Sequence, residues 1–372
     1  MKKIGITGQQ GFIGNYLYNT LKLTPNLYQI IEFERDYFEN EEKLNHFVSK
    51  CDVIVHLAAM NRHDVPQVIY DTNIGLVVKL INSCNTSNSK PHILFSSSSQ
   101  EEQDNLYGNS KKVGRKLFQE WSVQSGATFT GLIIPNVFGP FGKPFFNSVI
   151  STFCHQILND NIPTIHKDGN LKLIYVADLV KEIIIKIEEP KSQRPYVINY
   201  TKEIKVSEIL TLLEVFKKSY KEKSEIPIIH NAFELNLFNT FRSFIDIENY
   251  FPVKYNEYSD SRGSFVELVR LGIGGQVSFS TTKPNITRGN HYHTRKIERF
   301  SVIKGQALIQ LRKIGTKKIF NFYLNGDEPS YVDMPIWYTH NIKNIGNETL
   351  YTNFWINEPY NEEDSDTYIE EV

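Results

Sequence analysis

The chain has 372 residues, of which 40% are hydrophobic and 13% aromatic. That length exceeds most single domains and the composition supports a large core, so we expect two folded domains and exclude global disorder. A net charge of −1 gives no electrostatic reason to expect binding to nucleic acid or to an anionic membrane. The chain has three scattered cysteines without a CxxC motif, a strand predicted from residue 3 onward and no long apolar run. These features predict a cytoplasmic protein without a membrane span.

The first fourteen residues place a short apolar strand directly before three spaced glycines and the start of a helix. Gly8 permits a tight turn, Gly11 lets the backbone approach a pyrophosphate, and Gly14 lets the helix pack against the strand. The spacing therefore predicts a dinucleotide-binding turn. The residues expected to contact the cofactor here are Gly8, Gln10, Gly11, Phe12, Ile13 and Gly14.

Apolar runs alternate with helical patterns as far as residue 134. Strands are predicted at 28–33, 52–59, 92–95 and 128–134, and helices at 12–23, 39–48, 65–85 and 110–124. This alternation is typical of a doubly wound parallel sheet, which binds ligands beyond the carboxyl ends of its strands. Residues 136–247 lose the alternation and are interpreted as a substrate lobe, in which Asp178 is expected to cap the N-terminus of a helix at 179–187.

Tyr107 and Lys111 are four residues apart, so on a helix both side chains project from the same face. A lysine ammonium beside a phenol lowers the pKa of the phenol, which can then exchange a proton with a carbonyl oxygen during hydride transfer. A serine at the end of the strand that precedes them would hydrogen-bond the same oxygen. The pair alone is common in helices. Combined with the glycine turn and the Phe95–Ser98 run, it indicates carbonyl chemistry.

Over residues 1–245 these motifs resemble the extended short-chain dehydrogenase/reductase family. The resemblance implies a catalytic triad of Tyr107, Lys111 and Ser98, with Ser97 as the alternative serine. Tyr107 and Lys111 would also bind the cofactor, together with Leu57 and Ala58 of the His56–Ala59 stretch.

Two departures from the family bear on the reaction and the substrate. Ser99 and Gln100 stand where sugar dehydratases of the family carry an acidic pair, which favours simple carbonyl reduction. The arginine that usually lies three residues before Asn136 is missing, although Asn136 is still expected to contact the substrate.

Arg35 follows the second predicted strand and bears on the choice of cofactor. An acidic residue at this strand end would hold a ribose 2′-hydroxyl, whereas an arginine suits a 2′-phosphate. Glu32 and Glu34 lie close by, and a surface role for Arg35 is the alternative. We predict NADPH as the cofactor in preference to NADH.

Residues 263–356 show short apolar strands broken by Gly, Pro and Asn, which predicts a small antiparallel barrel or jelly roll. His291 and His293 are two apart, so on a strand they face one point, and Glu298 and His340 can reach it from neighbouring strands. Three imidazoles and a carboxylate suit a divalent transition metal, zinc in preference to iron, nickel or manganese. The spacing resembles the two motifs of the cupin family, except that Trp337 replaces the usual glycine after Pro335.

The whole chain resembles the bifunctional capsular polysaccharide synthesis enzymes, through stretches at 107–111, 135–139, 147–154, 260–265, 289–293, 338–341 and 366–368. The resemblance implies a reductase domain over residues 1–247 and a cupin epimerase domain over 248–372. The cupin would epimerise C3 of a UDP-4-keto-6-deoxy-N-acetylhexosamine. The reductase would then reduce the C4 ketone, giving a UDP-N-acetyl-6-deoxy-L-talosamine-type precursor of UDP-N-acetyl-L-fucosamine.

Several alternatives stay open. Lys283, Tyr292 and Tyr338 are unranked candidates for moving the C3 proton, and the metal could serve only to stabilise the barrel. The chain could also be a reductase or 4-epimerase of another nucleotide sugar with a dimerising cupin, or a nucleotide-sensing scaffold. We expect a homodimer, because cupin barrels often pair through sheet edges. The acidic stretch 362–366 is expected to be solvated, whereas Tyr368 and Ile369 are candidates for docking onto the domain.

Overall fold

The computed structural model describes residues 1–255, 257–260, 263–266, 268, 274–358 and 361–372. The chain forms two compact units, of which the first comprises residues 1–152 and 165–207 and the second 153–164 and 208–372. Helices from residue 208 onward thus belong to the barrel-containing unit. The predicted boundary at residue 247, which separates a reductase domain from a cupin domain, stays a prediction. Residues 261–262, within one stretch that carries the resemblance, lie outside the described residues.

The main sheet of the first unit is parallel throughout, as the alternation predicts. Its order is β2-β1-β3-β4-β5-β8, and every neighbouring pair runs in the same direction. The strands are β1 (Lys2–Thr7), β2 (Tyr28–Ile31), β3 (Val53–His56), β4 (His92–Ser98), β5 (Phe129–Ile134) and β8 (Gln193–Val197). A smaller sheet contains β6 (Asn136–Phe138), β7 (Asn170–Tyr175) and β9 (Lys202–Lys205).

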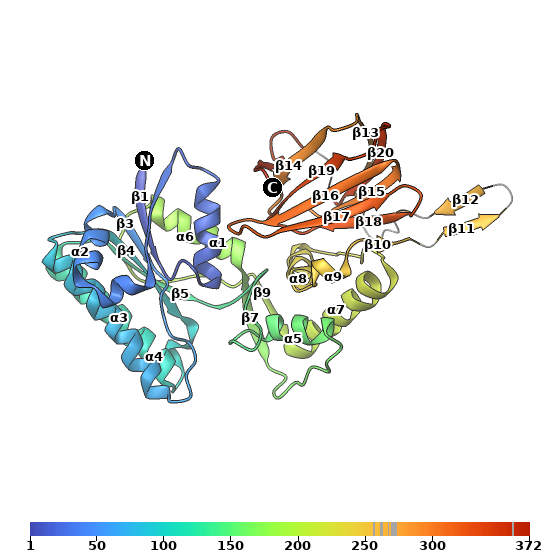
Figure 1. Ribbon diagram of the computed structural model, residues 1–372. Coiled ribbons are helices and arrows are strands. Elements are labelled where there is room, and N and C mark those ends of the chain that lie inside the picture. The colour runs from blue at the N-terminus through green and yellow to red at the C-terminus, as the bar shows by residue number, and fades with distance from the viewer. Residues whose placement is uncertain (256, 261–262, 267, 269–273, 359–360) are drawn as a thin grey trace. The chain divides into compact units, whose positions relative to one another are not determined.

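Helices cover both faces of this sheet (Figure 1). On one face α2 (Glu41–Lys50), α3 (Pro66–Thr86) and α4 (Leu106–Ser125) pack side by side, and on the other α1 (Phe12–Lys22) packs with α6 (Val176–Glu188). The first face has a continuous apolar core that includes Phe47, Leu80, Phe95, Phe118 and Phe129. The short helical turns η1 (Arg35–Glu39) and η2 (Ser99–Glu102) follow β2 and β4, and α5 (Val149–Leu158) follows β6.

Two local predictions in this part of the chain are wrong. Helix α4 begins at Leu106 rather than at residue 110, because Asn105 caps it by accepting a hydrogen bond from the Gly108 amide at 2.7 Å. Helix α6 begins at Val176 with Tyr175 at the N-cap, so Asp178 is not the cap. Asp178 lies inside the first turn, where a carboxylate complements the helix dipole.

The second unit contains two five-stranded antiparallel sheets, in the orders β10-β18-β15-β20-β13 and β17-β16-β19-β14-β21. Side chains such as Val302, Ile309, Phe322, Val332 and Ile342 form one core. This architecture confirms the predicted all-β cupin-like jelly roll after a Rossmann-like domain. The strands are β10 (Val253–Lys254), β13 (Gln276–Thr282), β14 (Thr287–Tyr292), β15 (Glu298–Lys304), β16 (Gln306–Lys313), β17 (Ile319–Asn325), β18 (Ser330–Met334), β19 (Tyr338–Asn344), β20 (Leu350–Ile356) and β21 (Tyr368–Ile369). A separate hairpin pairs β11 (Glu257–Asp260) with β12 (Gly263–Val266).

Helices α7 (Val206–Phe216), α8 (Ala232–Arg242) and α9 (Ile247–Tyr250), with the π-helical turn η3 (Lys217–Glu222), precede the barrel. A buried polar network ties them to it. Arg299 on β15 makes a two-pronged ion pair with Asp333 on β18, at 2.8 and 3.1 Å, and the Tyr220 hydroxyl donates to the same carboxylate. Because both charges are hydrogen-bonded, their burial is compensated. The network explains why residues beyond 208 form one unit with the barrel.

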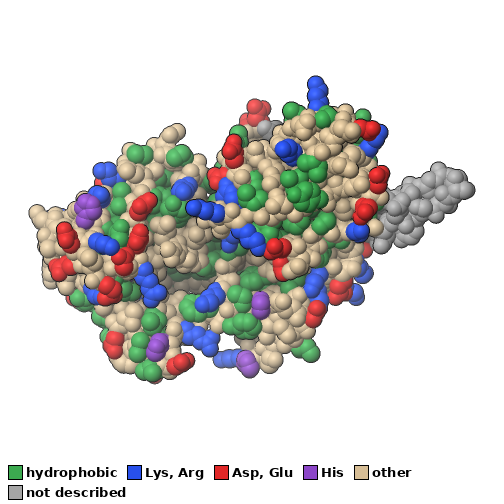
Figure 2. Space-filling model, in the orientation of Figure 1, with side chains coloured by type: hydrophobic (Ala, Val, Ile, Leu, Met, Phe, Trp, Pro, Cys, Tyr) green, Lys and Arg blue, Asp and Glu red, His purple; other side chains and the backbone are tan. Residues whose placement is uncertain are grey.

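In the described part of the chain, no helix is long and apolar enough to cross a membrane. On the face drawn in Figure 2, acidic and basic side chains are interspersed, as expected for a chain with a net charge of −1.

Candidate active site and metal centre

The glycine turn has the geometry of a dinucleotide cradle. Gly8 has a φ of 76°, and a Cβ on it would lie 2.7 Å from the backbone nitrogen of Ala58. A Cβ on Gly14 would lie 2.2 Å from the carbonyl oxygen of Gly8. Helix α1 starts with Gly11 as its N-cap and no side-chain cap, so its first N–H groups are open to an anion. Leu57 and Ala58 were predicted within a strand but follow β3 in a loop, and they lie beside the turn. Their contact with the cofactor stays a prediction.

Arg35 is exposed and begins η1, four residues after β2 ends at Ile31. It therefore lies at the carboxyl edge of the sheet, on the strand next to β1. A ribose held by the glycine turn is recognised at this edge in doubly wound folds. The position is consistent with the predicted contact to a 2′-phosphate.

The three predicted catalytic side chains lie together. Tyr107 is in the first turn of α4, and Lys111 one turn later is 3% exposed. The Lys111 ammonium donates to the Ser96 carbonyl at 2.9 Å and lies 5.8 Å from the centre of the Tyr107 ring. Ser98, the last residue of β4, hydrogen-bonds Tyr107. The alternative serine, Ser97, is buried and donates instead to Glu101, so the geometry favours Ser98.

Burial controls the ionisation of this pair. It raises the pKa of Tyr107 to about 12, which the hydrogen bond with Ser98 opposes. It also lowers the pKa of Lys111 to about 8, against the attraction of Glu101. The expected shift of the Tyr107 pKa towards neutrality is therefore not seen in the protein alone. At neutral pH the phenol is protonated and the lysine still charged, an arrangement that suits donation of a proton to a ketone.

Glu101 is a carboxylate near this site that the sequence reasoning did not consider. It is 6% exposed and receives two short hydrogen bonds from the Arg115 guanidinium, at 2.9 and 2.6 Å. Together with Ser97 these contacts occupy both of its oxygens. A carboxylate so engaged is unavailable as the acid or base of a dehydration, in agreement with the missing acidic pair.

Asn136, the predicted substrate contact, is the first residue of β6 and is exposed. Its side-chain amide donates to the Lys172 carbonyl at 3.3 Å. Because β6 follows β5 after a single residue, Asn136 lies at the carboxyl edge of the main sheet. That edge also carries Ser98.

The four predicted metal ligands converge in the second unit. His291 and His293 lie on either side of Tyr292 at the end of β14, Glu298 begins β15, and His340 is on β19. One donor atom from each lies within 4.8 Å of the others. The Glu298 Oε2 atom is 3.1 Å from His293 Nε2, 3.0 Å from His340 Nε2 and 4.0 Å from His291 Nε2.

These residues fit a divalent cation. The Nε2 atoms of His293 and His340 and the Oε2 atom of Glu298 are buried and make no well-formed hydrogen bond, and buried polar atoms normally have partners. The other ring nitrogens of both histidines donate to carbonyl oxygens, Nδ1 of His293 to Asp366 at 2.5 Å and Nδ1 of His340 to Tyr338 at 3.2 Å. A carbonyl only accepts, so Nδ1 carries a proton in each histidine, which leaves Nε2 as the nitrogen that can bind a cation. Burial, followed by the neighbouring His340, lowers the pKa of His291 to about 4 and keeps this third imidazole neutral.

The structure separates the three candidates for proton transfer. Tyr292 is buried on the opposite face of β14 from His291, where its ring stacks on Tyr368 with centroids 5.4 Å apart. Lys283 is exposed in the loop between β13 and β14. Tyr338 lies on the same face of β19 as His340, two residues away, and burial raises its pKa to about 12. Tyr338 is thus the best placed of the three.

Lys313 is a functional candidate that the sequence reasoning missed. On β16 it pairs with Tyr338, just as Leu311 pairs with His340, so its side chain belongs to the same face of the barrel as the metal ligands. No motif marks it, because its position depends on strand register. The alternation of apolar and polar residues along 306–313 was the available signal.

Trp337 explains the departure from the cupin glycine. It adopts a φ of 61°, in the left-handed region that glycine favours. Its ring packs on Tyr292 with centroids 5.6 Å apart, and its amide donates to the His293 carbonyl at 2.7 Å. Packing and hydrogen bonding therefore hold the backbone conformation that the motif needs.

Comparison with known proteins agrees with both sites. Residues 4–199 match the NAD dependent epimerase/dehydratase family and residues 258–368 match the polysaccharide biosynthesis C-terminal domain. A reductase of Pseudomonas aeruginosa, UDP-2-acetamido-2,6-beta-L-arabino-hexul-4-ose reductase, is 31% identical over 369 residues, which are 98% of each protein. The crystal structure of the capsular polysaccharide assembling protein CapF from Staphylococcus aureus is 35% identical, with a TM-score of 0.63 and full coverage of both chains.

The chain belongs to the CapF-like family of capsular polysaccharide proteins. It is an enzyme of the reductase/epimerase type with an NAD(P)-binding fold. A more distant likeness, to the UDP-glucose 4-epimerase of Thermotoga maritima, has 20% identity, a TM-score of 0.55 and covers 65% of this chain and 98% of the other. At that identity it shows the fold alone.

Proposed function

We propose that this CapF-like protein carries out two successive steps on a UDP-4-keto-6-deoxy-N-acetylhexosamine: epimerisation at C3 in the barrel and reduction of the C4 ketone in the Rossmann-like domain. The product would be a UDP-N-acetyl-6-deoxy-L-talosamine-type precursor of UDP-N-acetyl-L-fucosamine. The observation that carries the proposal is the presence of two intact sites, each with its own chemistry, along a chain that aligns end to end with a nucleotide-sugar 4-ketoreductase.

In the reductase step, Tyr107 donates its phenolic proton to the C4 oxygen while Ser98 hydrogen-bonds that oxygen. Lys111 places a positive charge beside the phenol, which stabilises the phenolate formed as the proton leaves. The nicotinamide cofactor supplies the hydride when bound. Glu101 is engaged by Arg115 and Ser97, so elimination of water does not compete.

In the epimerase step, a proton leaves C3, whose acidity the neighbouring ketone raises. His291, His293, Glu298 and His340 would hold the divalent metal, zinc in preference to others, and such a cation supplies Lewis acidity at a ketone oxygen. Tyr338, with Lys313 beside it on β16, is our candidate for the proton carrier. A metal that only stabilises the barrel is the alternative, which exchange of the C3 proton in the metal-free protein would favour.

Reduction should depend on pH through Lys111. Its lowered pKa, about 8, means that the ammonium is charged below that pH and neutral above it. We therefore expect kcat/KM for ketone reduction to be constant near pH 6–7 and to fall about tenfold per pH unit well above pH 8. Stopped-flow measurement of NADPH oxidation across this range tests the expectation. A rate that rises through pH 8 would contradict it.

Arg35 should set the preference for NADPH over NADH. Arg35→Ala removes a charge-assisted contact to the 2′-phosphate, so we expect the Kd of NADPH to rise about tenfold while that of NADH stays the same. Fluorescence titration with both cofactors measures this. Lys50→Ala is the matched control, because it also removes an exposed basic side chain. Lys50 is the last residue of α2, at the end of that helix farther along the chain from Arg35. Equal losses for the two cofactors would assign Arg35 a merely structural role.

The proposed enzyme acts in the cytoplasm as a homodimer. Its cysteines, Cys51, Cys84 and Cys154, are all free and buried, consistent with a reducing compartment. The decisive assay mixes the 4-keto sugar nucleotide with NADPH and follows absorbance at 340 nm. Oxidation supports the reductase assignment. No oxidation of NADPH here, together with interconversion of the two C4 epimers when a 4-hydroxy UDP-sugar is supplied with NAD⁺ instead, would favour the alternative, a 4-epimerase with a structural cupin.

A further inference from the structure

The acidic stretch after β20 is not solvated along its whole length, contrary to the sequence prediction. Asp366 is 4% exposed, and Tyr368 and Ile369 form β21, which pairs antiparallel with Tyr292 and His291 of β14. We call residues 365–371 the clasp. Because β21 pairs with the strand that carries the histidine motif, the clasp is part of the barrel next to the metal centre.

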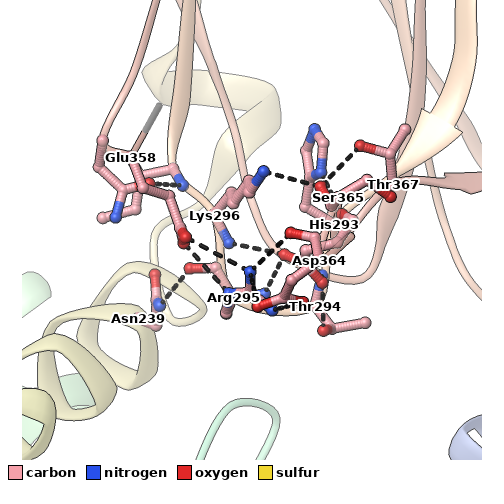
Figure 3. Close-up of polar contacts among 12 residues, drawn as sticks. Asn239, His293, Thr294, Arg295, Lys296, Glu358, Asp364, Ser365 and Thr367 are labelled. Carbon is pink, nitrogen blue, oxygen red and sulfur yellow. Dashed lines mark hydrogen bonds and ion pairs between the residues drawn. The ribbon is translucent and has the colours of Figure 1, made fainter. Parts of the chain in front are cut away.

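The Asp366 carboxylate fixes the loop between two metal ligands. It accepts hydrogen bonds from the amides of Thr294, Arg295 and Lys296 at 3.0–3.1 Å and from the Thr294 hydroxyl at 2.6 Å. The Lys296 ammonium, on a residue 1% exposed, donates to the Ser365 carbonyl at 2.7 Å. In Figure 3 the Lys296 ammonium points to Ser365, next to His293. The loop begins after His293 and ends at Glu298, so both ligands are positioned by it.

The backbone of the clasp acts on the ligands directly. The Asp366 carbonyl accepts the Nδ1 proton of His293 at 2.5 Å, which sets the tautomer that aims Nε2 at Glu298. At the C-terminal end of the clasp, the Glu370 carbonyl accepts a hydrogen bond from the hydroxyl of Thr339, the residue before His340 on β19. The clasp thus contacts residues at or beside the three histidine ligands and Lys296, two residues before Glu298, although it supplies no ligand itself.

We propose that the clasp is a positioning element for the metal centre, with Asp366 as its principal residue: it sets the affinity and coordination geometry of the bound cation. The proposal rests on the metal site of the proposed function, but not on the epimerase activity. A clasp that merely stabilises the barrel would change unfolding without changing the ligand field of the cation.

The test uses the full-length protein, Zn²⁺ in competition with a chromophoric chelator, and the visible spectrum of the Co²⁺-substituted protein. Asp366→Ala keeps the backbone carbonyl but releases the 294–296 loop, so the contact of that carbonyl with His293 is no longer held in place. The substitution should weaken Zn²⁺ binding about 10–100-fold, the range found when the outer-shell support of a ligand is lost, and should shift or weaken the Co²⁺ d–d bands. Thr294→Val removes only one of the hydrogen bonds and should give a smaller change in the same direction. It also keeps the test informative if Asp366→Ala fails to fold.

Glu362→Ala is the matched control, because Glu362 is an exposed acid four residues away and its loss changes the net charge equally. It should leave both measurements unchanged. Zn²⁺ affinity and Co²⁺ spectra that match the wild type in both clasp variants, with only the melting temperature lowered, would overturn the proposal. A wild-type protein that binds neither cation would refute the metal centre itself. Normal metal binding without C3 exchange would refute only the epimerase assignment.

Discussion

Tyr107→Phe should lower kcat for NADPH-dependent ketone reduction about 10²–10⁴-fold, the range that general acid catalysis contributes. The variant removes one hydroxyl whose proton is retained at neutral pH by a pKa of about 12. The Lys111 contact to the Ser96 carbonyl does not depend on that hydroxyl, so Lys111 and the glycine turn should still bind the cofactor and only the contact of the Tyr107 hydroxyl should be lost. Single-turnover oxidation of NADPH at 340 nm gives the rate.

Two observations complete this experiment. Exchange of the C3 proton with solvent deuterium should persist in Tyr107→Phe, because that step belongs to the barrel. Tyr18→Phe, on α1 of the same unit, should retain the wild-type rate of reduction. Undiminished turnover in Tyr107→Phe would show that another group protonates the C4 oxygen.

The His293→Ala substitution should abolish stoichiometric metal binding and slow C3 exchange about 10²–10³-fold. The expected loss corresponds to the several kcal/mol that a Lewis acid contributes at a developing oxyanion. His293 is chosen because its Nε2 atom lies 3.1 Å from Glu298 and its Nδ1 proton is already committed to Asp366. Elemental analysis and NMR in D₂O measure the two effects.

His230→Ala is the control for that substitution, since His230 is an exposed histidine of the same unit. It should leave metal content and exchange unchanged. If exchange survives in His293→Ala after the metal has been lost, the cation has a structural role and the barrel moves the proton by its own side chains.

Much of this arrangement could be read from local patterns. Three motifs combine a residue type with a fixed spacing: the glycine turn, the Tyr107–Lys111 pair and the His291–His293 pair. The spacing along a helix or strand determines which side chains share a face. For the same reason the parallel sheet and the antiparallel barrel were predictable from alternation. Full-length similarity to CapF is consistent with both.

What could not be read depends on contacts between distant residues. The pKa of Tyr107 follows from burial, which a short motif does not reveal, and burial outweighs the hydrogen bond with Ser98. Lys313 faces the ligand side only because β16 pairs with β19 in one register. Asp366 appeared to belong to a solvated acidic run. Its burial depends on three amides some 70 residues earlier in the chain.

The central claim, two ordered steps on one sugar, is tested most directly by running the complete reaction in D₂O with NADPH and analysing the product by NMR. We predict a single solvent deuterium at C3, inverted configuration there, and protium delivered from NADPH at C4. A reduced product that keeps protium and the original configuration at C3 would contradict the account, because the barrel would then play no part in the chemistry.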